Sequence, residues 1–245
     1  MPCLRWMAAT TGALITALAG AAHAADMPHD RPPLPAPPPP PAIDWQNWGW
    51  YLRGDVGWYS GILGGVTGVP GFADPSNNKL GTGITAGGGA GIKTRWLRTD
   101  LTIDYASPAK YTGTSAAPND VTAKIQSLAV LFNGYFDLTT WYRMTPYIGA
   151  GAGTALVRVS NYQNPAPPFT GAPTSSQWNF AYAGMAGIGW AVTPNATIDL
   201  GYRYLNVGNV KSPSDANGAM TFRNVGAHEV RVGLRWSFDD LREFQ

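Results

Sequence analysis

The sequence predicts an all-β protein, an eight-stranded antiparallel up-and-down transmembrane β-barrel. Three observations support this fold class: eight segments alternate apolar with polar residues, their connections alternate long with short, and charge is scarce. Alternation with a period of two indicates strands with two unlike faces. Only 13% of the 245 residues are charged, about half the usual share. The chain also holds 30 Gly, 10 Trp and 11 Tyr, which favours a β-rich membrane protein over a soluble enzyme.

Residues 1–24 are expected to form a cleaved secretory signal peptide. Arg5 supplies a positive charge, residues 7–20 are mostly apolar, and residues 22–24 match the A-x-A cleavage pattern, so cleavage is expected before Ala25. The apolar stretch is too short for an anchor helix, because a membrane span needs about 20 apolar residues.

A proline-rich segment, residues 25–44, follows the predicted signal. Its prolines include an unbroken run over residues 37–41. Such a run adopts polyproline II and forms a semi-rigid spacer, so we expect a periplasmic spacer. The alternatives are a ligand for a proline-binding partner and a contact with the cell wall.

Eight alternating segments are expected to form the barrel, which covers residues 45–238 and is followed by a short tail, residues 239–245. The clearest segment is the third, where leucine and isoleucine alternate with Asp100 and Asp104. The second is rich in glycine, which suggests close packing or sharp curvature inside a narrow barrel. Glycines also leave the facing of the fifth segment open. The segments are residues 48–59, 83–93, 97–105, 121–138, 146–159, 177–192, 196–205 and 228–238.

The connections between these segments alternate in length. Outer-membrane barrels have long loops outside and short turns in the periplasm. An even number of strands then places both ends of the mature chain in the periplasm. A soluble barrel also alternates, but its apolar face points inward. The long connections are residues 60–82, 106–120, 160–176 and 206–226, and the short ones are residues 94–96, 139–143 and 193–195.

The faces expected to point into the lumen carry six positive and six negative charges. Unpaired buried charges are very costly, so this matched set predicts a lumen plugged by ion pairs and hydrogen bonds. A selective pore would carry an excess of one sign, and a conducting channel remains the alternative. The predicted network consists of Arg53, Asp55, Lys93, Arg98, Asp100, Asp104, Asp137, Asp199, Arg203, Glu229, Arg231 and Arg235.

Aromatic residues cluster near the strand ends on the side of the short turns. Amphipathic rings favour the depth of the membrane interface, so these side chains are expected to face lipid there rather than to pack in a core. They are Trp48, Trp50, Trp96, Trp141, Tyr142, Trp190, Trp236 and Phe238.

The last segment resembles the β-signal of outer-membrane proteins, in which a polar residue is followed two positions on by a glycine and then by an apolar and an aromatic residue two positions apart. Here these are Arg231, Gly233, Trp236 and Phe238. The resemblance implies recognition by the barrel-assembly machinery. The signal usually ends the chain, whereas residues 239–245 follow it here.

Together with "GWYLRGDVGW", "RTDLTIDY", "PYIGAGAG" and "LGYRY", this segment makes the chain resemble the small eight-stranded barrels of the OmpA/OmpX type, including opacity-like surface proteins and porin-like antigens of Gram-negative bacteria. The resemblance implies a location in the cell outer membrane and structural, adhesive or weak pore-forming roles.

Catalytic and cofactor-binding signals are weak. The single cysteine, Cys3, falls in the predicted signal, so no thiol or cysteine metal site is expected in the mature chain. His29 lies in the spacer, and His228 should face outward while its neighbour Glu229 faces inward, which does not favour a catalytic dyad. We therefore expect no enzyme activity, no cofactor and no metal. A net charge of +2 does not favour nucleic-acid binding.

The leading hypothesis is a non-enzymatic outer-membrane barrel with a structural or surface-exposed role and a plugged lumen. One alternative is a small porin for ions or small solutes. The other is an adhesin that binds a host or surface ligand through its long loops, in which Tyr111, Tyr162 and Phe169 are expected to be exposed. Expected partners are outer-membrane lipids, lipopolysaccharide and, during biogenesis, the assembly machinery.

Overall fold

The computed structural model describes residues 49–68, 74–114, 120–163, 174–214 and 218–238. The predicted signal, spacer and tail, together with Trp48 and Phe169, lie outside these residues. No helix in the described part of the chain is long and apolar enough to cross a membrane.

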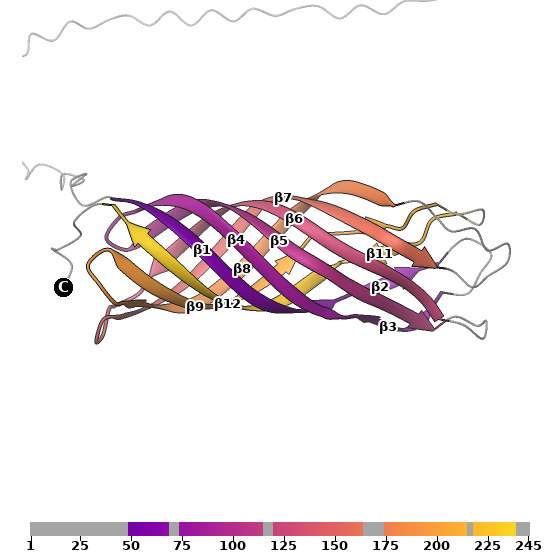
Figure 1. Ribbon diagram of the computed structural model, residues 1–245, viewed down its shortest axis with the longest axis horizontal. Coiled ribbons are helices and arrows are strands. Elements are labelled where there is room, and N and C mark those ends of the chain that lie inside the picture. Colours follow the sequence, from indigo (N-terminus) through magenta and orange to yellow (C-terminus); the bar gives the residue numbers. More distant parts are fainter. Residues whose placement is uncertain (1–48, 69–73, 115–119, 164–173, 215–217, 239–245) are drawn as a thin grey trace, which may run out of the picture. The chain divides into compact units, whose positions relative to one another are not determined.

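Eight long strands form a closed antiparallel barrel (Figure 1). Each strand pairs with the next along the chain, and the last pairs with the first, from Tyr51 opposite Ser237 to Ile62 opposite Gly226. The eight-stranded up-and-down prediction is confirmed. The strands are β1 (Gly49–Ile62), β4 (Thr82–Lys93), β5 (Leu97–Thr114), β6 (Asp120–Asp137), β7 (Met144–Gln163), β8 (Ser175–Ala191), β9 (Ala196–Asn206) and β12 (Gly226–Ser237).

The two ends of the barrel differ, and we call them the turn end and the loop end. The short predicted connections lie at the turn end. The connection from β6 to β7 closes in a two-residue turn, where Tyr142 (φ 48) and Arg143 (φ 66) both have positive φ and Trp141 and Met144 exchange backbone hydrogen bonds of 2.8 and 2.9 Å. This geometry fits the twist of the flanking strands.

At the loop end the strands are longer than the sequence predicted. β5 continues to Thr114 and β7 to Gln163, into stretches predicted as loops. Four short strands also lie within the other two predicted loops. They are β2 (Gly65–Thr67), β3 (Ser76–Leu80), β10 (Val210–Lys211) and β11 (Thr221–Arg223). β3 pairs with the extension of β5, while β10, β11 and β2 form a separate three-stranded sheet.

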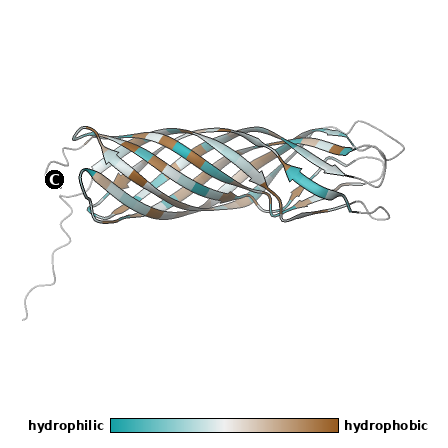
Figure 2. Cartoon of the chain, turned by 90° about the horizontal axis from the view of Figure 1, so that it is seen from below, coloured by the Kyte–Doolittle hydropathy of each residue, from teal (hydrophilic) through white to brown (hydrophobic). Residues whose placement is uncertain are grey.

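Hydrophobic and hydrophilic residues alternate along the strands (Figure 2), and in β5, β6 and β7 the chemistry of the two faces changes along the strand. In the half nearer the turns, β6 has Phe132 outside and Asn133 inside. Nearer the loops the same strand keeps its alternation, but Lys124 is outside and Ile125 is inside. β5 shows the same inversion, with Lys110 outside and Tyr111 inside, and this part of β5 was predicted as a loop because the prediction followed apolar residues on the outer face.

An apolar band surrounds the barrel in the half nearer the turns. In β1 it runs from Trp50 to Trp58, which matches the roughly 9–11 residues that a tilted strand needs to cross a bilayer. Other outward members are Leu52, Val56, Ile84, Leu101, Ile103, Phe132, Ile148, Leu200, Val232 and Leu234.

Aromatic side chains border this band at both ends. At the turn end, the aromatic residues that the sequence predicted to face lipid are exposed, as far as the structure describes them. They are Trp50, Trp96, Trp141, Tyr142, Trp190, Trp236 and Phe238. A second group, which the sequence analysis did not identify, marks the other border. It consists of Trp58, Tyr105, Trp178, Phe180, Tyr182 and Tyr202.

Candidate functional site in the lumen of the barrel

The charged lumen is the candidate functional site. Strand alternation turns the twelve predicted charges inward, where eleven are buried or nearly so and Lys93 is the most exposed. Each of the twelve takes part in at least one ion pair. The pairs are Arg53–Asp55, Arg53–Asp100, Lys93–Asp137, Arg98–Asp137, Arg203–Asp104, Arg203–Glu229, Arg231–Asp55, Arg231–Asp104, Arg231–Glu229 and Arg235–Asp199.

One ion pair crosses the full width of the lumen. Arg203 Nη1 on β9 lies 2.8 Å from Asp104 Oδ2 on β5. β5 and β9 are four strands apart in either direction around the barrel, so they form opposite walls. Arg203 Nε also donates to Glu229 Oε2 at 2.8 Å, and Arg231 pairs with Asp104 from β12. Three strands are thereby joined through the interior.

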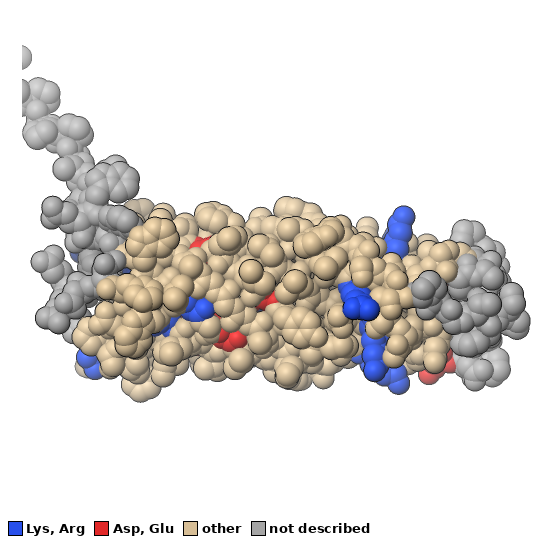
Figure 3. Space-filling view, turned by 45° about the horizontal axis from the view of Figure 1, so that its top comes forward, with Lys and Arg blue, Asp and Glu red and all other residues tan. Residues whose placement is uncertain are grey.

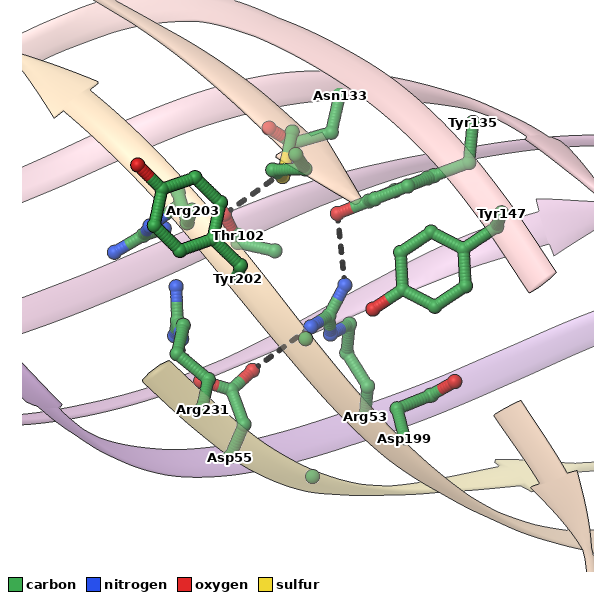
Figure 4. Close-up of a pocket in the computed structure, with 13 residues that line it drawn as sticks. Arg53, Asp55, Thr102, Asn133, Tyr135, Tyr147, Asp199, Tyr202, Arg203 and Arg231 are labelled. Atoms are coloured by element: carbon green, nitrogen blue, oxygen red, sulfur yellow. Dashed lines mark hydrogen bonds and ion pairs between the residues drawn. The ribbon is translucent and has the colours of Figure 1, made fainter. Parts of the chain in front are cut away.

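A second bridge involves Arg53 on β1 (Figure 4). Its guanidinium lies 3.1 Å from Asp55 and 3.2 Å from Asp100, and it donates to the Tyr135 hydroxyl on β6 at 2.8 Å. Asn133 donates to Asp100 at 2.7 Å and to Thr102 at 3.1 Å. These charge-assisted contacts are individually strong and together hold the interior in one arrangement.

Nearer the turns the ion pairs are fewer. Arg98 Nε donates to Asp137 Oδ1 at 2.8 Å, and its guanidinium lies 4.8 Å from the ring centroids of both Tyr135 and Tyr147. Tyr147 was missed by the sequence analysis because the facing of its strand was left open. Arg235 makes one ion pair, with Asp199 at 3.3 Å, and its guanidinium lies 5.7 Å from the centroid of the Tyr51 ring.

Glycines make room for these large side chains. A Cβ at Gly87 would collide with the Asp104 carboxylate, and one at Gly151 would collide with the Asn133 amide oxygen. The close packing predicted for the glycine-rich second segment is therefore confirmed. The inward position of Gly151 also shows the facing of β7, in which Ala150 and Ala152 point outward.

Little space remains between the charged side chains. A cavity of 20 Å³ borders Arg53, Tyr147 and Asp199, and one of 40 Å³ lies further toward the loops, beside Glu229. A single water needs about 10–15 Å³, so each has room for only one or a few waters.

Above the charged layer, an apolar core fills the loop end. Tyr111 and Tyr162, predicted to be exposed, are 0% and 3% exposed, so that prediction is wrong. They point inward because of the inverted pattern, and the Tyr111 ring makes an edge contact with Phe222 of β11, with centroids 4.8 Å apart. The short β2–β11–β10 sheet thus contributes Val66 and Phe222 to this core.

The outer surface of the loop end is basic (Figure 3). Lys110 on β5 and Lys124 on β6 are direct register partners there. Asp74 and Asp120 are the exposed acidic residues among the described residues of this end. The exposed basic residues, which we call the basic face, are Lys79, Lys110, Lys124, Arg158, Lys211 and Arg223.

The remaining predicted residues are placed as follows. Arg231 and Gly233 of the predicted β-signal point inward, and Trp236 and Phe238 are exposed outside. His228 lies on the outer face, with Nδ1 2.5 Å from the Tyr202 hydroxyl, while Glu229 is buried in the lumen. Among the described residues, no group of three or more His, Cys, Asp or Glu side chains could hold a metal ion.

An antiparallel barrel with an apolar band outside and paired charges inside is a membrane-spanning β-barrel. Comparison with known families shows which kind of membrane barrel this is. The model of the outer membrane protein beta-barrel domain family matches residues 12–238. The chain belongs to this family, and membership implies a location in the outer membrane.

Similar proteins support the assignment. An uncharacterized protein of Brucella abortus is 31% identical over 92% of this chain and 95% of its own length. A Rickettsia conorii protein named as a candidate adhesin is 27% identical, covering 76% of this chain and 81% of its own length. The crystal structure of Neisserial surface protein A shares the fold, with a TM-score of 0.50 and 20% identity over 78% of this chain and 97% of that one.

Proposed function

We propose that this protein is a non-enzymatic outer-membrane barrel with a non-conducting lumen, and that its loop end is a surface-exposed recognition platform. The observation that carries the proposal is the Arg203–Asp104 ion pair, which joins opposite walls at 2.8 Å. A pair that spans the lumen obstructs a solute in that plane. Its carboxylate is engaged by Arg203 and Arg231, so it is poorly suited to act as a catalytic base.

The second layer of the plug supports the same proposal. An ion that passed the charged network would next meet the core around Leu131, Val157 and Phe222, which are 0% exposed. Moving an ion into an apolar interior is very costly. A small porin is therefore the less favoured alternative.

In the proposed orientation, the loop end faces the outside of the cell and the turn end faces the periplasm, as is usual for outer-membrane barrels. Export would use the predicted signal peptide, residues 1–24. β5, β6 and β7, which have 18, 18 and 20 residues, exceed the roughly 9–11 residues needed to cross a bilayer. Their surplus length at the loop end would form a rigid platform outside the membrane.

An adhesive role is the second candidate. It is favoured by the similarity to the Rickettsia conorii candidate adhesin and by the platform, whose ordered core would hold the connecting loops in fixed positions. Residues on loops carried by a rigid scaffold often provide recognition. Exchanging the four loops for those of a non-binding barrel should abolish surface binding, and retained binding would exclude this role.

We propose lipopolysaccharide as a lipid partner of the barrel, and the basic face as the surface that binds its anionic groups. It lies just beyond the aromatic residues at the loop-end border of the apolar band, and in the proposed orientation this is the depth of the lipopolysaccharide phosphates. Clustered lysine and arginine side chains attract anionic head groups.

Single-channel conductance in a planar bilayer tests the proposed plug. We expect no discrete openings from the folded wild-type barrel, whereas a variant that opens both layers, with Arg203→Ala, Asp104→Ala and Phe222→Ala, should show them. A heat-modifiable gel shift checks that both proteins are folded. Reproducible openings of the wild type would assign the protein to the porins instead.

A further inference from the structure

The turn end holds a cavity that the plug does not explain. Its volume is 380 Å³, and four cationic side chains and one carboxylate line it together with threonine hydroxyls. The cations are Lys93, Arg95, Arg143 and Arg235, and the carboxylate is Asp137. The charges of the whole lumen balance, but this cavity, which we call the vestibule, has a local excess of positive charge.

Arg235 is the deepest of these cations and is incompletely paired. Its side chain is 5% exposed, and its contact with Asp199 uses only Nη2, at 3.3 Å. Within the described residues, its Nε and Nη1 have no hydrogen-bond partner. Unsatisfied buried donors are costly. Nε and Nη1 donate on different sides of the guanidinium, so each needs an oxygen acceptor of its own, such as an oxygen of a carboxylate or phosphate.

The rim brings further cations from separate turns. Arg95 lies in the β4–β5 turn and Arg143 in the β6–β7 turn, and both are exposed. The Arg143 carbonyl accepts a hydrogen bond of 3.0 Å from the Ala191 backbone N–H, which fixes this turn against β8. Lys93 pairs with Asp137 at 3.4 Å and keeps 25% of its side chain exposed.

Asp137 cannot neutralise the vestibule, because it is already shared. It pairs with Lys93 and with Arg98, whose guanidinium lies behind the cavity. The vestibule therefore keeps its excess of positive charge, which favours a ligand that carries a negative charge. The vestibule is also large enough for an oxyanion and several waters, since one water needs about 10–15 Å³.

From this geometry we propose that the vestibule is a binding site for an oxyanion, a phosphate or carboxylate group, held by Arg235 at its base and by Lys93 and Arg143 at its rim. The group has two available sources. One is a free anion that enters from the turn end. The other is this chain itself, because Asp239 and Asp240 closely follow Ser237 in the sequence, and Ser237 lines the vestibule.

Calorimetric titration with inorganic phosphate tests the site. The full chain is extracted from outer membranes in detergent and titrated at constant ionic strength, alongside a variant with Asp239→Asn and Asp240→Asn. Lys93→Gln and Arg143→Gln are chosen because both residues are partly exposed and their loss should leave the barrel folded. Lys124→Gln, on the outer face of the loop end, is the matched control.

We expect saturable binding that weakens about tenfold in each rim variant, the effect of losing one charge-assisted contact, and that is unchanged in Lys124→Gln. Binding to the wild type would identify a free anion as the occupant. Binding only after the two aspartates are replaced, with the same dependence on Arg143, would identify the chain's own carboxylates. Absence of binding in both backgrounds, or equal weakening by Lys124→Gln, would overturn the proposal.

Discussion

Lys110 of β5 and Lys124 of β6 lie directly opposite each other on the outer face of the loop end. Like charges at opposed positions of an antiparallel pair destabilise the sheet. Arg158, on the next strand, adds a further positive charge, since its register partner Gln126 is two residues from Lys124. Such an arrangement is favourable when an anion lies against it.

Replacing Lys124 by Glu should convert this repulsion into attraction. In detergent without lipopolysaccharide, we expect the free energy of unfolding to rise by about 0.2–1 kcal/mol, measured by urea titration with tryptophan fluorescence. In vesicles that contain lipopolysaccharide, the same variant should instead lose stability relative to the wild type. Replacing both Lys110 and Lys124 by Glu restores a like-charge pair and should cancel the gain. A gain that persists in the double variant would argue against direct repulsion.

Asp104 is predicted to be among the residues most important for stability. Its replacement by Ala leaves Arg203 and Arg231 buried with fewer partners, and breaking a buried ion pair costs about 3–5 kcal/mol. Asp120→Ala, at an exposed position of the loop end, is the matched control and should change stability by less than about 0.5 kcal/mol. Equal effects of the two variants in urea unfolding would contradict the proposed importance of the network.

Replacing Gly153 by alanine and replacing Gly134 by alanine should have different effects on the stability of the barrel. A Cβ at Gly153, inside β7, would meet the Val130 backbone carbonyl, whereas a Cβ at Gly134, on the outer face of β6, has no atom within 4 Å. We expect Gly153→Ala to cost about 1–3 kcal/mol through overpacking. Gly134→Ala should be neutral or stabilise by up to about 1 kcal/mol. Unfolding midpoints of the refolded barrel measure both, and a tolerated Gly153→Ala would show that the lumen is looser than described.

Stability at high pH should depend on Tyr111. Burial at the loop end, and secondarily Tyr162, raise the pKa of the Tyr111 hydroxyl from 10.0 to about 12. The contribution of a group with a raised pKa is fully present below the unfolded pKa and is lost as the pH rises through the folded one. Wild-type stability should therefore fall between pH 10 and 12 more steeply than that of Tyr111→Phe. Parallel unfolding curves of the two proteins across this range would refute the assignment.

The sequence was sufficient for the strands within the apolar band and, except in β7, for their facing. Alternation placed Arg203 and Asp104 inside without any knowledge of their partners. The pairing itself could not be predicted, because β5 and β9 meet only through the closure and tilt of the barrel, which local patterns do not encode. The vestibule likewise arises where three turns come together.

Other features of the fold could not be predicted because the residues involved do not show the expected contrast between apolar and polar faces. Glycine and alanine in β7 carry almost no contrast in polarity, so its facing was left open. The loop-end extensions keep the period of two but exchange inside for outside, as Lys124 and Ile125 show. β5 also contains a bulge between Ala106 and Ala109, which shifts its alternation by one residue. The strands β2, β10 and β11 are too short to show a period.

The exchange of inside for outside at the loop end also bears on how the protein enters a membrane. In the proposed orientation, the basic face must cross the hydrocarbon layer before it reaches the outer side, and a lysine or arginine at the bilayer midplane costs about 2–4 kcal/mol. Lys110, Lys124 and Arg158 would each meet this barrier during insertion and would raise an equal barrier to retreat. The charges that slow insertion therefore also slow extraction. The finished barrel should be held in the membrane kinetically as well as by the burial of its apolar band.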